Sequence, residues 1–102
     1  MTESEFNQLA DSVFRKIEQA ADDAGIECVE NGAVLELEFD NGHVIIINRH
    51  MPTREIWVAA RTGGFHYARI DREWVSSRDG SELFGKLTEL ANQEGAELGF
   101  DG

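Results

Sequence analysis

The chain has 102 residues, of which 41% are apolar, and 20 acidic side chains outnumber nine basic ones. The formal net charge of −11 disfavours a nucleic-acid or anionic-membrane partner, because phosphate contacts need clustered lysine and arginine. It favours a basic protein surface or hard cations. A single cysteine, Cys28, excludes an internal disulfide and fits a reducing compartment. Apolar runs such as residues 44–47 are far too short to span a membrane, and the acidic N-terminal segment is unlike a signal peptide, so we expect a cytoplasmic protein.

The first predicted element is an amphipathic helix over residues 2–24. Thr2 and Glu5 have the spacing of a capping box, and Gly25 is a plausible stop signal. Apolar residues recur at steps of three or four, which places them on one buried face: Phe6, Leu9, Val13, Ile17, Ala20 and Ala24.

The middle of the chain predicts a run of antiparallel strands. Strict alternation of apolar and acidic residues over 35–40 indicates a strand with one solvent-exposed face. Asn41-Gly42 is typical of a type I′ hairpin turn. Further strands are expected over residues 43–49, 54–61, 65–70 and 73–76. Gly63-Gly64 and Asp71-Arg72 are the predicted turns between the last three.

A second helix is predicted after Asp79, with Glu82 three residues on and a buried stripe of Leu83, Leu87, Leu90 and Ala91. It closes at Gly95, and we expect a loose tail after about residue 95. The order helix, strands, helix predicts an α+β fold. It is a two-layer sandwich in a single domain over residues 1–102, with both terminal helices on one face of a five- to six-stranded antiparallel sheet.

Carboxylates are the first candidate functional groups. One set lies on or just after the first helix: Asp11, Glu18, Asp22, Asp23, Glu27 and Glu30. A second set, Glu36, Glu38 and Asp40, points away from the apolar side of the first predicted strand. If the helix end lies against that strand, the two sets merge into one surface, called here the acidic ridge. Oxygen-rich surfaces suit hard cations held weakly with water. The alternative is an ordinary solvated helix face.

The second candidate is an exposed sheet face around Trp57. Ile56, Val58 and Ala60 suit packing under helices, which leaves Glu55, Trp57 and Ala59 on the opposite face. Asn48 alternates with Ile45 and Ile47 in the preceding strand, so its side chain can lie on the same surface as Trp57. An exposed indole is a natural interface anchor. If the two faces were exchanged, Trp57 would instead belong to the core.

Catalytic groups form no recognisable set. The three histidines have no metal-ligand spacing, and Cys28 has no thiol partner and no nearby basic residue to lower its pKa. No nucleophile elbow or phosphate-binding glycine loop is present. We therefore expect a protein that is not an enzyme.

Several stretches, taken together and in order, resemble the bacterial branch of the frataxin family. They are FNQLAD and IEQAADD in the first helix, NGAVLELEFDNG over the first hairpin, and then IIINR, IWVAA and GGFHY. The resemblance extends from Glu5 to about Gly95 and implies a two-helix α/β sandwich.

The resemblance also implies a function and site residues. Its members bind ferrous and ferric iron weakly through surface carboxylates and contact cysteine desulfurase with its scaffold protein. The family's iron-site carboxylates match Glu18, Asp22 and Asp23. Its further acidic position matches Asp40, and its partner-binding sheet residues match Asn48 and Trp57.

The resulting prediction is an iron-binding regulator or iron chaperone of iron–sulfur cluster assembly, monomeric without iron. Its metal-binding residues are predicted to be Asp11, Glu18, Asp22, Asp23 and Glu27, and its partner-binding residues Asp40, Asn48, Glu55 and Trp57. Two alternatives remain open: an acidic interaction module without a metal role, and a ferroxidase that oxidises Fe²⁺ to Fe³⁺.

Overall fold

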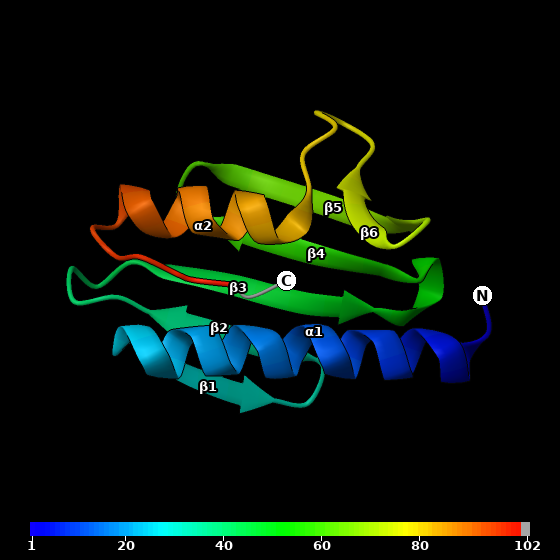
Figure 1. Ribbon diagram of the computed structural model, residues 1–102, viewed down its shortest axis with the longest axis horizontal. Helices are drawn as coiled ribbons and strands as arrows, with labels where there is room; N and C mark the ends of the chain where they lie inside the picture. Colours follow the sequence, from blue (N-terminus) through cyan, green and yellow to red (C-terminus); the bar gives the residue numbers. More distant parts are fainter. Residues whose placement is uncertain (101–102) are drawn as a thin grey trace.

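The computed structural model describes residues 1–100 and consists of two layers, with both helices on one face of a single sheet (Figure 1). The elements in chain order are α1 (Glu3–Ala24), β1 (Glu27–Asn31), β2 (Val34–Glu38), β3 (Val44–His50), the short 3-10 helix η1 (Met51–Thr53), β4 (Glu55–Ala60), β5 (Gly63–Ile70), β6 (Glu73–Ser76) and α2 (Leu83–Gln93). The predicted α+β sandwich is therefore confirmed. No helix in the described part of the chain is long and apolar enough to cross a membrane.

Helix α1 begins and ends where the sequence predicts. Thr2 accepts a hydrogen bond from the backbone N–H of Glu5, and the Glu5 carboxylate accepts one from the backbone N–H of Thr2, which completes the capping box. Gly25 ends the helix in the left-handed conformation at φ 71°. One face of the helix is buried: Phe6, Ala10, Val13, Phe14, Ile17, Ala20 and Ala21.

The six strands pair in sequence order, each antiparallel to the next. The sequence does not predict β1, an edge strand whose residues are mostly exposed, and places Glu27 and Glu30 only just after the first helix. A signal for it was present in Asn31-Gly32, because Gly32 at φ 62° turns the chain from β1 into β2. Because β1 was not predicted, the acidic ridge lies in a different position from the one expected.

Two predicted turns differ in detail. After β2 the Gly42 N–H donates to the Phe39 carbonyl, and only Gly42 in this turn has a positive φ, 88°. This is a three-residue hairpin loop that ends in a left-handed glycine, so the predicted type I′ turn is wrong. Gly63 and Gly64 are not turn residues either, since they pair with Ala60 and Ala59 at the start of β5.

Helix α2 has the predicted buried stripe but a different cap. The Glu82 carboxylate accepts hydrogen bonds from the backbone N–H groups of Phe84 and Gly85, so Glu82 is the N-cap and Asp79 is not. Asp79 instead accepts hydrogen bonds from the backbone N–H and hydroxyl of Ser81, which lower the pKa of Asp79 to about 2. Residues 77–79 form a turn, and the antiparallel bridge between Val75 and Glu82 keeps Glu82 in extended backbone, so the helix begins only at Leu83.

The segment after residue 95 is predicted to be loose, but it packs back onto the core. Leu98 is only 4% exposed and belongs to the same apolar cluster as both helices and the sheet. Phe100 lies against Phe84, with ring centroids 4.9 Å apart. Figure 1 shows this segment running back from the end of α2 alongside the two helices. Residues 101–102 lie outside the described part of the chain.

Candidate functional site

The carboxylates of helix α1 differ in how free they are. Asp22 and Asp23 are exposed near the end of the helix, and Asp23 only accepts a hydrogen bond from Gln19, 3.0 Å away. Glu18 pairs with the Nε atom of Arg15 at 2.8 Å, and Asp11 pairs with Arg49 at 2.7 Å. The two arginines therefore neutralise part of the predicted metal-binding set, and the unpaired negative charge concentrates at Asp22 and Asp23.

Strand β1 divides the acidic ridge between the two faces of the sheet. Glu30 pairs in register with buried Leu35 and binds Arg15 at 2.7 Å, so it lies on the helix side. Glu27 pairs with Glu38, and the side chains of both lie on the opposite, open face. Glu27 is therefore not part of the α1 surface with which the sequence groups it. The acidic ridge surrounds the β1 edge instead of forming one continuous stripe.

The helix-side acids and the open-face acids of the ridge meet at one end of the molecule, in a polar hollow of about 430 Å³. Its walls come from the end of α1, the end of β2 and the segment after α2, and its acidic residues are Asp23, Glu38, Asp40, Glu94 and Glu97. The sequence predicts Asp23 and Asp40 as site residues and Glu38 as a ridge acid, but it gives no reason to place the last two acids beside them. They arrive there because α2 ends next to the β2–β3 loop.

Glu94 is the most strongly bound carboxylate of the hollow. It accepts a hydrogen bond from the Nδ1 atom of His43 at 2.9 Å and one from the side-chain amide of Asn41 at 3.3 Å. Arg61 lies 3.7 Å from its other oxygen. The hydrogen bond from His43, then that from Asn41 and the charges of His43 and Arg61, hold the pKa of Glu94 below its usual range. Glu94 therefore stays ionised in moderately acidic solution.

Metal coordination at this end would have to be shared with water. Among residues 1–100, no three or more histidine, cysteine, aspartate or glutamate side chains converge as a ready-made metal site. Exposed carboxylates can still hold a hydrated hard cation through one or two oxygens, as carboxylate sites for Mg²⁺ do. The arrangement suits weak surface binding and differs from the buried carboxylate and histidine cage of a di-iron oxidase.

The open sheet face carries the second predicted set. Asn48, Trp57 and His66 lie side by side on β3, β4 and β5 in register, and all three have partly or fully exposed side chains. Ile56 and Val58, the neighbours of Trp57 along β4, are buried beneath the helices. Trp57 therefore lies on the face without helices, and the alternative that exchanges the two faces is wrong.

Trp57 is held rigidly between two histidines. The rings of His50 and His66 stack on its two sides, with centroids 3.7 Å and 4.1 Å from that of Trp57. Glu55 accepts a hydrogen bond from the indole Nε1 of Trp57 at 2.9 Å and another from the hydroxyl of Thr53. These bonds, that of Trp57 first, lower the pKa of Glu55. A fixed aromatic side chain loses little conformational freedom when a partner covers it.

The sequence misses this three-ring stack. Spacing along the chain does not reveal it, because the stack depends on which residues the pairing of β3, β4 and β5 brings side by side. That register follows from the turns. The signal available from the sequence was that Trp57 and His66 lie in predicted strands and His50 directly follows another.

Cys28 contributes no chemistry to the site. Burial, together with the nearby carboxylates of Glu18 and Glu30, raises the pKa of its thiol to about 11. A thiol with such a pKa is almost fully protonated at neutral pH, and only the thiolate is a good nucleophile or metal ligand.

Comparisons with known proteins agree with this fold. A model of the frataxin-like domain matches residues 1–97. The chain belongs to the frataxin-like family. A curated relative from Janthinobacterium sp. (strain Marseille), named iron-sulfur cluster assembly protein CyaY, is 43% identical over 93% of this chain and 91% of its own length. A relative of the same name from Ralstonia nicotianae is 50% identical over 92% of this chain and 88% of its own length.

Solved structures of frataxins have the same architecture. Frataxin from Psychromonas ingrahamii superposes with a TM-score of 0.92 at 34% identity, with all of both chains covered. Trimeric frataxin from Saccharomyces cerevisiae, complexed with ferrous iron, superposes with a TM-score of 0.70 at 25% identity over 92% of this chain and 86% of that one.

Proposed function

We propose that this protein is an iron-binding regulator of iron–sulfur cluster assembly that binds cysteine desulfurase and its scaffold protein through the acidic ridge. The observation that carries the proposal is the unpaired negative charge at Asp22 and Asp23, next to the acidic hollow that contains Asp40. Further support comes from relatives that match most of the chain and are named iron-sulfur cluster assembly protein CyaY.

Electrostatic attraction is the physical basis of the proposed binding. A protein of net charge −11 with acids on both sides of one sheet edge attracts a basic groove over a distance set by the ionic strength. The open face then offers Trp57 as a rigid apolar anchor, with Asn48 and Glu55 beside it. We place this activity in the cytoplasm, with the protein as a monomer in the absence of iron.

Iron enters the proposal as a cargo or signal held at the surface. Fe²⁺ would bind weakly through the exposed carboxylates of Asp22, Asp23 and their neighbours, and water would complete its coordination shell. Bound iron neutralises charges that the partner needs, so metal and partner would compete for the same surface. We propose no enzymatic turnover.

The test of partner binding is its response to charge. We expect the affinity for cysteine desulfurase to fall steeply between low and high salt, because the screening length shrinks from about 10 Å at 0.1 M to about 3 Å at 1 M. Asp22→Lys and Asp23→Lys should each weaken binding far more than Glu89→Lys, which makes the same charge change on the exposed side of α2. Equal effects of all three variants would remove the acidic ridge from the interface.

The test of the metal role is anaerobic calorimetry with Fe²⁺, with NMR spectra recorded in parallel. We expect weak binding that broadens the resonances around Asp22 and Asp23 and disappears in the double variant Asp22→Asn/Asp23→Asn. No heat and no broadening, with partner binding intact, would leave an acidic interaction module without a metal role. Oxygen consumption that depends on these carboxylates would instead indicate a ferroxidase.

A further inference from the structure

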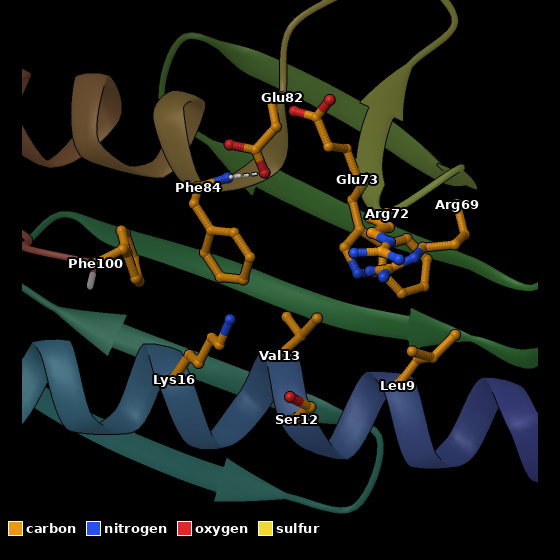
Figure 2. Close-up of a pocket in the computed structure, with 11 residues that line it drawn as sticks. Leu9, Ser12, Val13, Lys16, Arg69, Arg72, Glu73, Glu82, Phe84 and Phe100 are labelled. Carbon is orange, nitrogen blue, oxygen red and sulfur yellow. Dashed lines mark hydrogen bonds between the residues drawn. The ribbon is translucent and has the colours of Figure 1, made fainter. Parts of the chain in front are cut away.

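A second hollow of about 380 Å³ lies between the two helices, next to the β5–β6 edge of the sheet. Its walls include Lys16 and Val13 from α1, Phe84 from α2, Arg69 from β5, Trp74 from β6, and Phe100. Figure 2 shows Lys16 and Ser12 along one margin and Glu82 with Glu73 along the opposite one. None of its lining residues belongs to the acidic ridge or to the Trp57 surface.

Basic side chains gather in this hollow although the protein is strongly acidic. Lys16, Arg69 and Arg72, three of the nine basic residues, line it, and none of them forms an ion pair with a carboxylate of residues 1–100. Of its two acids, Glu82 already uses both carboxylate oxygens to cap α2. With Glu73 and Glu82 both counted, the three basic side chains still leave the hollow with a net charge of +1, which favours an anion.

Aromatic rings supply the rest of the wall. Phe84 and Phe100 pack together, and the amino group of Lys16 lies 5.5 Å from the centroid of the Phe84 ring. The guanidinium of Arg69 lies 5.6 Å from the centroid of the Trp74 ring. Cations next to apolar rings favour a ligand that has both a charged and an apolar part.

Trp74 gives independent evidence for a missing partner. It is 1% exposed, and its indole Nε1–H is a buried donor that meets no acceptor among the described residues. Buried donors without a partner are rare in folded proteins, and each one asks for an explanation. Trp74 is one of the residues that line the hollow, so a ligand there would lie against the side chain that carries this donor.

We propose that this hollow binds a small carboxylate that carries an aryl or branched-alkyl group. The planar guanidinium groups of Arg69 and Arg72 suit a carboxylate, to which arginine donates paired hydrogen bonds. The apolar group is accommodated by Phe84, Phe100 and Val13. Such a carboxylate is available as a free small molecule or as the C-terminal residue of another polypeptide. The proposal is independent of iron and of cysteine desulfurase.

The indole resonance of Trp74 provides a direct readout. The chain has only two tryptophans, so a Trp57→Phe variant identifies the Trp74 Nε1–H signal in a ¹H–¹⁵N spectrum. We expect 3-phenylpropionate to move this signal in a saturable way, with a Kd of about 1 mM or tighter. Its neutral analogue 3-phenylpropanamide, which lacks the charge, should bind at least about tenfold more weakly.

Variants test the residues. Arg69→Gln/Arg72→Gln should weaken binding of the carboxylate about tenfold, whereas Arg78→Gln, which changes an exposed arginine outside the hollow, should leave it unchanged. Acetyl-Gly-Gly-Phe with a free C-terminus, compared with the amidated peptide, distinguishes the sources: tighter binding than 3-phenylpropionate favours a polypeptide end, and weaker binding favours a free small molecule. Absence of any saturable shift, or equal binding of acid and amide, would overturn the proposal.

Discussion

The facing pair Glu27 and Glu38 allows the energetic cost of the acidic ridge to be measured. These residues stand directly opposite each other on β1 and β2, and both side chains lie on the open face. Like charges in this position destabilise a sheet. We therefore expect Glu38→Gln, and separately Glu27→Gln, to stabilise the folded protein.

The size of the effect follows from the register. Opposite residues in an antiparallel pair have Cβ atoms about 5 Å apart, which brings the two carboxylates to about 6 Å. Coulomb's law at that distance gives about 0.7 kcal/mol in a water-like dielectric. For a domain of this length, the gain corresponds to a rise in Tm of about 3–6 °C.

The assay is thermal unfolding of the two single variants and the double variant at neutral pH, in low salt and in 1 M NaCl. Because removal of either charge abolishes the repulsion, the double variant should gain less than the sum of the singles, and 1 M salt should reduce every gain. Glu3→Gln is the control for net charge, since Glu3 lies in the first turn of α1, where a negative charge is favourable. Additive gains, or an equal gain from Glu3→Gln, would refute the reasoning.

Three further predictions concern groups outside this pair. Leu98→Ala should lower the free energy of unfolding by about 2–5 kcal/mol in urea titrations, because Leu98 is 4% exposed in the core, while Glu97→Ala at the exposed neighbouring position should change little. Glu55→Gln should destabilise the protein at pH 7. Because the folded-state pKa of Glu55 is lowered, that contribution is fully present above the unfolded pKa and is lost as the pH falls through the folded pKa, so the difference in unfolding free energy between variant and wild type should shrink below about pH 4.3 and vanish below the folded pKa. Iodoacetamide should alkylate Cys28 very slowly at pH 8 and faster only as the pH approaches 11, and rapid reaction at pH 8 would show that the thiol is not held protonated.

The carboxylates of the acidic ridge differ in whether an arginine pairs with them. Asp11 is paired with Arg49 of β3, and Glu18 is paired with Arg15, which also binds Glu30 of β1. Asp22 and Asp23 have no such partner among the described residues and remain available to a cation or a basic surface. Under the proposed function, the repulsion between these two carboxylates is the cost of leaving them free to bind.

Local chemistry let the sequence alone determine much of the fold. The capping box of Thr2 and Glu5, the helix stop at Gly25 and the alternation over residues 35–39 each involve neighbours a few residues apart, and the structure has all three. Local alternation also placed Trp57 on the open face, because side chains in a strand point to opposite sides in turn.

Tertiary structure decided what depends on residues far apart in the chain. The exposed β1 has no apolar alternation to reveal it, yet pairing with β2 turns Glu27 to the open face and Glu30 toward Arg15. Packing between the helices likewise buries Leu98 in a segment that reads as a tail. Register across three strands creates the His50–Trp57–His66 stack, and the meeting of α1, α2 and the sheet edge creates the basic hollow. These features follow from the closing of distant segments onto one core, which no local pattern encodes.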